Sequence, residues 1–328
     1  MIRIPETMSQ LITGEQLPTP AAASGSVVFP LGLATLVVAL LLTGCAAGST
    51  PGSAGLQVVA TIYPLKYFAA QVGGEQAQVT GLVPAGVEAH DWEPAPQHLT
   101  AIEKAAVFVY NGAGFEPWVD RMLGMLKSER TIVVNATEGL SLRASGEAAS
   151  GPPDPHVWLD PLNARAQVSI IRDALVRADP KHEDLYRANA QKLAQRLETM
   201  HRRFEAGLSQ CQRRDIIVAH DAFQYLADRY NVRVHSIAGV SPDVEPSPSQ
   251  LAKLVKEARA QGATHIFFET LVDPALARTL AKEVGAETLV LNPLEGLTKE
   301  EAAAGEDYFT VMEQNLKNLQ KALGCQVG

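Results

Sequence analysis

Apolar runs of strand length alternate with helical patterns from Leu56 almost to the end of the chain. The strand-like runs are 57–63, 78–83, 105–110, 131–134, 215–219, 232–239, 264–269 and 287–292. The helix-like segments around them are 65–74, 116–126, 163–177, 249–261, 274–284 and 308–323. Alternation of this kind is typical of crossover units around a mostly parallel sheet, so the pattern predicts an α/β fold.

One amphipathic segment, 181–210, is longer than the others. Its apolar positions, at steps of three or four residues or their multiples, are Leu185, Leu193, Leu197, Met200, Phe204 and Leu208. A single helix of this length measures ~45 Å and can run along two lobes. We therefore predict a rigid connecting helix between an N-terminal α/β lobe, 56–180, and a C-terminal α/β lobe, 211–328.

The residues before the first predicted strand have a different character. The run VVFPLGLATLVVALLLTG, residues 27–44, carries no charge and ends at Cys45, before a small-residue stretch. It is typical of a secretory signal, and its last residues, L-T-G-C, resemble a bacterial lipobox. We expect a signal peptide at 1–44, a lipid on Cys45 and a linker at 45–55. A plain transmembrane anchor is the alternative, but it gives Cys45 no role.

Composition narrows the possible partners. The chain has 328 residues, of which 46% are hydrophobic and 20% charged, which is ordinary for a globular protein. A net charge of −8 argues against general nucleic-acid binding, which needs an excess of Lys and Arg.

The chain has two cysteines besides Cys45, namely Cys211 and Cys325. In an exported protein this pair favours a disulfide over a catalytic thiol, with two separate buried thiols as the alternative.

Three histidines lie in predicted loops: His90 and His220 follow predicted strands, and His156 follows a Pro-rich loop. His90 lies in VEAHDWEP, His156 in DPHVWLD and His220 in VAHDAF. Ligands of α/β sheets bind outside the carboxyl ends of the strands, and neutral imidazole is a good ligand for first-row divalent metals. Taken singly, each could be a loop or core histidine with a backbone hydrogen bond. Together they favour a metal site.

Each of the three has a carboxylate close by in sequence. These neighbours are Asp91, Asp154 with Asp160, and Asp221. A carboxylate that accepts from a ligating imidazole fixes its tautomer and orientation. The other histidines are weaker candidates: His98, His182 and His201 are expected on solvated helix faces, and His235 and His265 within strands.

Five stretches in order resemble one family over residues 56–323. They are IYPLKYFAAQVGGEQAQVTGLVPAGVEAHDWEPAPQ, DPHVWLDPLNA, VAHDAFQYLADRYNV, SPDVEPSPSQL and FFETLVDPALARTLAKEVGA. The chain resembles the solute-binding proteins of zinc/manganese-type ABC importers, the cluster A-I family. That resemblance implies a metal held between two α/β lobes by His90, His156 and His220.

The fourth ligand departs from the family pattern. The family places an Asp after its last strand, where LVLNPLEGL here has Asn292. Glu295 is the preferred replacement because an anionic ligand lowers the charge of the closed site, with Asn292 or water as alternatives. Glu269, at a strand end, could support the ligands or could face solvent.

Three imidazoles and one oxygen suit tetrahedral Zn²⁺, with Mn²⁺ as the alternative. The implied function is capture of the ion by a monomer and its delivery to a membrane permease. A separate ATPase must supply the energy, because the chain has no P-loop. The rival is a secreted zinc hydrolase with three histidines and an open water position, although no H-E-x-x-H occurs. A surface adhesin has no positive feature beyond export.

Overall fold

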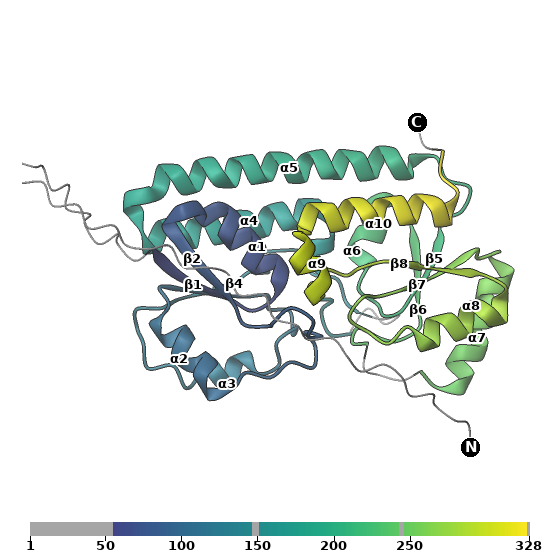
Figure 1. The fold of residues 1–328 in the computed structure, drawn as a ribbon, viewed down its shortest axis with the longest axis horizontal. Coiled ribbons are helices and arrows are strands. Elements are labelled where there is room, and N and C mark those ends of the chain that lie inside the picture. The colour runs from purple at the N-terminus through teal and green to yellow at the C-terminus, as the bar shows by residue number, and fades with distance from the viewer. Residues whose placement is uncertain (1–54, 146–150, 243–245, 327–328) are drawn as a thin grey trace, which may run out of the picture. The chain divides into compact units, whose positions relative to one another are not determined.

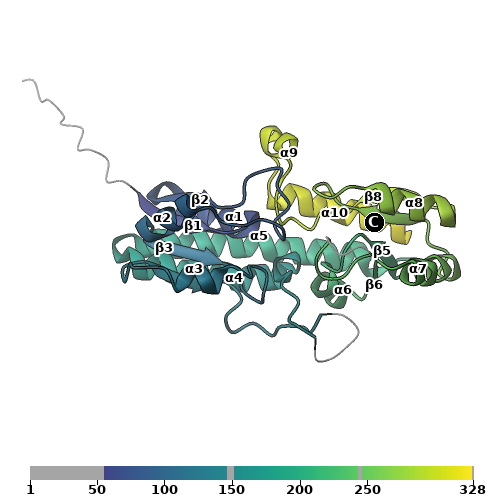
Figure 2. The same cartoon turned by 90° about the horizontal axis from the view of Figure 1, so that it is seen from below.

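The computed structural model describes residues 55–145, 151–242 and 246–326. In these residues the predicted fold class is confirmed, with two parallel-stranded α/β lobes joined by one long helix (Figures 1 and 2). The predicted signal peptide 1–44, Cys45 and linker residues 46–54 lie outside the described residues. Among the residues described, every helix is too short or too polar to span a bilayer.

The first lobe is built on a four-stranded parallel sheet in the order β2–β1–β3–β4. Its strands are β1 (Leu56–Ala60), β2 (Ala77–Gly81), β3 (Val107–Tyr110) and β4 (Ile132–Asn135). Side chains alternate between the two faces of a strand. Val58 and Ala60 therefore enter one core cluster, while Val59 enters a second cluster on the opposite face.

Helices cover both faces of this sheet. The first cluster packs under α1 (Tyr63–Gly73) and α4 (Pro161–Ala178), and the second under α2 (Pro96–Lys104) and α3 (Val119–Leu123). Figure 1 shows α2 and α3 together on the side of the sheet away from α1 and α4. Burial on both faces explains why the strands read as nearly continuous apolar runs.

The long helix is α5 (Glu183–Ser209), close to the predicted 181–210. It begins after a 3₁₀ turn, η3 (Pro180–His182), and its 27 residues span ~40 Å. It contacts α1 and α4 of the first lobe, and α6 (Gln224–Tyr230) and α10 (Tyr308–Leu323) of the second. Figure 1 shows α5 running beside α4 and then α10.

The second lobe has two parallel strand pairs. One pair joins β5 (Asp215–Val218) to β6 (Arg233–Ser236), and the other joins β7 (His265–Phe268) to β8 (Glu287–Val290). On one side, Ile217 and Ile266 pack under α7 (Pro248–Ala260) and α8 (Ala275–Val284). The short helix α9 (Lys299–Ala304) follows the last strand.

The main core cluster is continuous between the lobes. It contains Val58 and Val109 of the first sheet, Phe204 of α5, and Val218 and Met312 of the second lobe. All described residues belong to one compact unit. A shared core of this kind restricts motion of one lobe against the other.

Cys211 and Cys325 are joined by a disulfide in this structure. Cys211 follows the end of α5, and Cys325 follows the end of α10. The bond therefore links the ends of two helices that pack beside each other in the second lobe.

Candidate metal centre

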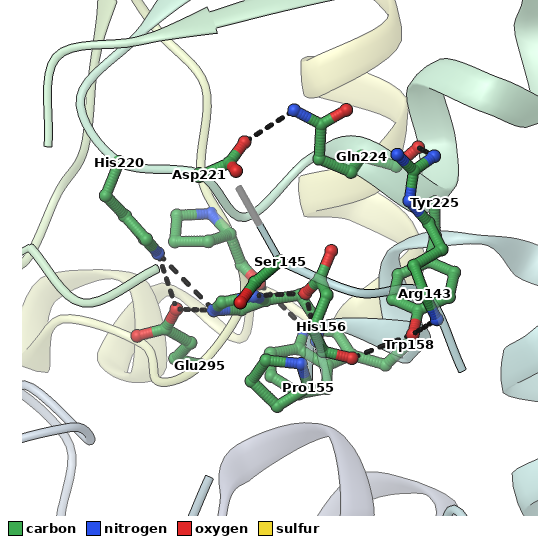
Figure 3. A network of polar contacts seen from close by, with 12 residues as sticks. Arg143, Ser145, Pro155, His156, Trp158, His220, Asp221, Gln224, Tyr225 and Glu295 are labelled. Carbon is green, nitrogen blue, oxygen red and sulfur yellow. Dashed lines mark hydrogen bonds and ion pairs between the residues drawn. The ribbon is translucent and has the colours of Figure 1, made fainter. Parts of the chain in front are cut away.

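Four side chains from four separate loops converge at one point. His90 follows β2, His156 precedes the 3₁₀ turn η2 (Val157–Leu159), His220 follows β5 and Glu295 follows β8. His156 and His220 are fully buried, Glu295 is nearly so, and His90 retains slight exposure. Figure 3 shows the side chains of His156, His220 and Glu295 pointing toward one another.

The distances within this group match the geometry of a tetrahedral metal site. The Nε2 atom of His156 lies 3.3 Å from that of His90 and 3.4 Å from that of His220. Glu295 Oε1 lies 3.4, 3.3 and 3.2 Å from Nε2 of His90, His156 and His220. Ligand atoms at ~2.0–2.1 Å from a central zinc, at tetrahedral corners, are about 3.3 Å apart. The group could therefore hold one zinc-sized ion without rearrangement of the loops.

Two carboxylates orient two of the imidazoles. His156 Nδ1 lies 2.9 Å from Asp154 Oδ1, and His220 Nδ1 lies 2.6 Å from Glu269 Oε1. In the neutral tautomer with a proton on Nδ1, each ring donates to its carboxylate and turns the lone pair of Nε2 toward the centre. The sequence suggested Glu269 for a supporting role, with solvent exposure as the alternative; its carboxylate is buried against His220.

Two other neighbouring carboxylates named by the sequence have different partners. Asp160 caps α4 through the backbone N–H of Leu162 and forms an ion pair with Arg229. Asp221 accepts a hydrogen bond of 2.6 Å from Gln224. The expectation that Asp160 and Asp221 orient the site histidines is therefore wrong. Adjacency in sequence does not fix the direction of a side chain at a turn.

The opposite charges of the carboxylates and imidazoles shift each other's pKa values toward the charged forms. Burial raises the pKa of Glu295, but the charge and hydrogen bonds of the three histidines outweigh burial and hold this pKa well below its usual value. Burial lowers the pKa of His220, yet Glu269 and Glu295 together raise it well above the ordinary value. A cation at the centre would replace the protons on the imidazoles as the counter-charge to Glu295 and Glu269.

Another carboxyl group, that of Glu88, lies beside the centre. Burial, followed by the charge of Glu295, raises the pKa of Glu88 to about 8. The carboxyl group of Glu88 is therefore mostly protonated at neutral pH and adds little negative charge beside Glu295.

The loop after β3 supports His90 by packing. The ring of Phe115 lies 4.5 Å from that of His90, centroid to centroid. The adjacent Glu116 is buried and accepts hydrogen bonds from the backbone N–H groups of Asn111 and Gly112 and from the hydroxyl of Thr61. These bonds fix the loop that presents Phe115, a role that the sequence pattern did not indicate.

A tyrosine of the second lobe supports the segment that carries His156. The Tyr225 hydroxyl, on α6, donates to the backbone carbonyl of Asp154 at 2.8 Å. The same hydroxyl accepts from the backbone N–H of Arg143 at 3.0 Å. Figure 3 shows Tyr225 and Arg143 beside the segment that leads to His156. The predicted loop 142–155 thus contacts α6 at both of its ends, while its residues 146–150 lie outside the described part.

Asn292 lies in the loop of Glu295, but its side chain forms hydrogen bonds that hold the turn of that loop. Its Oδ1 accepts from the N–H of Leu294 at 2.8 Å, and its Nδ2 donates to the hydroxyl of Thr270 at 3.0 Å. These contacts give the Asn292 side chain a part in shaping the turn, while Glu295 faces the three histidines.

The remaining histidines have partners away from the centre. His98 caps α2 by accepting from the N–H of Ala95, and His182 contacts Asp179. The other contacts are His201 with Tyr230, His235 with Asp215 and His265 with Thr264. All five are half-buried.

Known proteins resemble this chain along most of its length. A family model described as "Zinc-uptake complex component A periplasmic" matches residues 58–322. The high-affinity zinc uptake system protein ZnuA of Bacillus subtilis is 37% identical over 300 residues, covering 87% of this chain and 94% of that protein. The zinc-binding lipoprotein AdcA of Streptococcus pneumoniae is 37% identical over 294 residues, or 86% of this chain.

The chain spans only 58% of the length of AdcA. The crystal structure of the Zn(II)-bound ZnuA-like domain of Streptococcus pneumoniae AdcA has a TM-score of 0.73 and 38% identity, covering 82% of this chain and 99% of that one. The predicted family resemblance is confirmed by these matches. The chain belongs to the family of the periplasmic zinc-uptake complex component A.

Proposed function

We propose that this chain is the extracytoplasmic solute-binding protein of an ABC importer and that its cargo is Zn²⁺. The observation that carries the proposal is the convergence of His90, His156, His220 and Glu295 at distances suited to a tetrahedral ion. The relatives that are named as zinc-binding or zinc-uptake proteins support the same cargo.

Zinc is favoured over manganese by the chemistry of the donors. Three imidazole nitrogens and one carboxylate oxygen suit zinc, whereas carboxylate, carbonyl and water oxygens suit manganese. The single anionic ligand, Glu295, leaves the bound ion with a net positive charge. Asp154 and Glu269, each one ring away, offset that charge without entering the coordination sphere.

Capture requires the imidazoles to lose their extra protons, and delivery requires a partner. Binding of the ion would release protons from the histidines, so uptake depends on pH. We propose that a lipid on Cys45 holds the monomeric protein at the outer face of the cell membrane. A permease with a cytoplasmic ATPase would then receive the ion, because this chain contains no phosphate-binding loop.

The alternative, a zinc hydrolase, fits the centre less well. A catalytic zinc has three protein ligands and a fourth position open to water. Here Glu295 Oε1 lies at 3.2–3.4 Å from Nε2 of all three imidazoles and the side chain is buried, which supports Glu295 as the occupant of that fourth position. A closed set of four protein ligands favours storage or transport over catalysis.

Native mass spectrometry of the purified protein tests this function. Titration with zinc and manganese, separately and in competition, is expected to give one bound zinc that manganese does not displace. His90→Ala should abolish or severely weaken this binding, and Glu295→Ala should weaken it. His201→Ala is the matched control, because His201 contacts Tyr230 on the α5 side of the second lobe.

Three results would contradict the proposal. Manganese retained in the presence of zinc would overturn the cargo, and no bound metal at all would remove the function. Unchanged zinc binding in Glu295→Ala would exclude Glu295 and favour Asn292 or water as the fourth ligand.

A further inference from the structure

The loop that carries Glu295 follows a strand of the second lobe, but two of its backbone carbonyls accept hydrogen bonds from the first lobe. The backbone N–H of Tyr63, at the start of α1, donates to the carbonyl of Glu295 at 3.2 Å. The N–H of Gly86 donates to the carbonyl of Leu297 at 2.8 Å. Glu295 is therefore held from the same side as His90, whose loop contains Gly86.

A third bond to this loop comes from the side chain of Trp158. Its Nε1–H donates to the carbonyl of Pro293 at 2.8 Å, two residues before Glu295. Trp158 is fully buried and belongs to the 3₁₀ turn that follows His156. Its ring lies 5.4 Å from the ring of His156, centroid to centroid. One indole thus touches the segments of two of the four converging residues.

The backbone next to the Pro293 carbonyl, which accepts this bond, needs such support. The next residue, Leu294, has a φ of 59°, in the left-handed region that residues other than glycine seldom adopt. Its N–H is held by Asn292 on one side of the peptide bond, and the Pro293 carbonyl is held by Trp158 on the other. The turn that aims Glu295 at the histidines is fixed by these two side chains.

Trp158 is itself held in place from the second lobe. The hydroxyl of Tyr308, at the start of α10, donates to the backbone carbonyl of Trp158 at 2.6 Å. Tyr308 is fully buried in the core cluster that both lobes share. The indole therefore has a fixed position before any ion enters the centre.

We infer that Trp158 is a positioning residue for the metal centre, which fixes the Glu295 carboxylate by its indole N–H bond to Pro293. This inference rests on the proposed zinc function. Groups that orient a ligand typically change metal affinity by ~10–100-fold. Loss of this bond should act on Glu295 and leave the three imidazoles in place.

The decisive variant is Trp158→Phe, which keeps an aromatic ring and removes the N–H. We expect its zinc affinity, measured by competition with a chromogenic chelator, to fall by ~10-fold. Trp118→Phe is the control, since Trp118 is also buried, at 3% exposure, but packs in the core cluster beneath α2 and α3. Its zinc affinity should equal that of the wild type.

A double-mutant cycle separates positioning from a general structural role. If Trp158 acts through Glu295, Trp158→Phe should cost no further affinity in a Glu295→Ala background. A merely structural role predicts the same ~10-fold loss in both backgrounds, and that result would overturn the inference. Equal zinc affinity of Trp158→Phe and wild type would overturn it as well.

A second variant covers the possibility that Trp158→Phe does not fold. Tyr308→Phe removes the hydroxyl that holds the Trp158 backbone, and it should lower zinc affinity by a smaller factor that also vanishes without Glu295. Unchanged affinity in Tyr308→Phe would then overturn the inference. Failure of the wild type to bind zinc would overturn the proposed function, and with it this inference, whereas the variant results above leave that function standing.

Discussion

The two lobes are built from the same kind of unit, yet they contribute unequally to the centre. The first has a continuous four-stranded parallel sheet with helices on both faces, whereas the second, in its described residues, has two separate parallel pairs. His90 and His156 belong to the first lobe, and the loop of Glu295 forms backbone bonds with that lobe. His220 comes from the end of β5 in the second.

This inequality shows where the order of the site comes from. The backbone of the Glu295 loop accepts hydrogen bonds from the first lobe, and the His156 segment also accepts bonds from Tyr225 and Tyr308 of the second lobe. His220 is held by Glu269 at the end of β7. The core cluster that runs between the lobes includes Val218, Ala222 and Phe223 on either side of His220. We therefore predict that metal capture needs little closure of one lobe on the other.

The largest expected effect concerns the disulfide of the second lobe. Replacing both Cys211 and Cys325 by Ser frees a loop with a sequence separation of 114 residues. Chain-entropy arguments give a loss of about 4–5 kcal/mol for such a loop. We expect the melting temperature of the metal-free protein to fall by about 10 °C, measured by calorimetry. Reducing agent should produce the same fall in the wild type.

Hydrogen exchange can show whether that loss belongs to the second lobe. Amides of β5 to β8 should exchange faster in the double Ser variant, while those of β1 to β4 keep their protection. An unchanged melting temperature would mean that the bond contributes nothing to stability. Equal loss of protection in both sheets would show that the lobes unfold as one.

The next effect compares ligands from the two lobes. If ~10–16 kcal/mol of zinc binding is shared among four ligands, each supplies about 3–4 kcal/mol, or on the order of 10²–10³ in affinity. His156→Ala and His220→Ala should both cost this much in chelator competition, with His201→Ala as the unchanged control. Full affinity in His220→Ala would show that the second lobe contributes no histidine to the centre.

Much of the fold could be predicted from local pattern. All eight apolar runs became strands, and 308–323 became α10 with the predicted bounds. Most strands are shorter than their runs because the runs continue past the last ladder bond, whereas β4 has four residues like its run and is shifted by one position. The short helices α6 and α9 were not anticipated, since a helix of six or seven residues has no sustained apolar period.

Less of the metal centre than of the fold could be predicted from local sequence pattern. Two of the histidines, His90 and His220, could be placed from the strands that precede them, because the carboxyl edge of a parallel sheet is set by the fold. His156 was marked by its position after a Pro-rich loop. The resemblance to a family implied a fourth ligand in the loop after the last strand, where it expects an Asp, and the need for an anionic ligand made Glu295 the preferred residue. The contact between Trp158 and Pro293 joins residues 135 positions apart in the chain. It depends on how two loops pack, which no period in the sequence records.

A smaller effect concerns the carboxylates that orient the imidazoles. Asp154→Asn and Glu269→Gln keep an oxygen near Nδ1 but remove its charge, so zinc affinity should fall by ~10–100-fold in each. Asp221→Asn is the matched control, because Asp221 contacts Gln224 instead of an imidazole. If only one of the two variants binds zinc more weakly, the orientation of the imidazoles depends on a single lobe.

The smallest effect depends on pH and lies in the second lobe. Asp215 of β5 pairs in register with Arg233 of β6 and accepts from its Nε at 2.8 Å. The hydrogen bonds of Arg233, and secondarily of His235, hold the pKa of Asp215 below its usual value despite partial burial. The folded pKa lies below the unfolded one, so the stabilisation is complete above pH ~4 and disappears as the pH falls through the folded pKa.

The side chain of Arg233 is 65% exposed, so solvent screens the pair and keeps its contribution to stability small. Asp215→Asn should lower the free energy of unfolding slightly at pH 7, measured by urea denaturation in the presence of chelator. The difference from wild type should shrink below pH ~4.

Gln57 and Gln78 form the matched cross-strand pair of the first sheet, with a side-chain hydrogen bond of 2.8 Å. Because neither titrates, Gln78→Ala should show a difference from wild type that does not vary with pH. A constant difference for Asp215→Asn as well would mean that the ion pair does not stabilise the β5–β6 pair, and that both sheets rely on packing and backbone bonds alone.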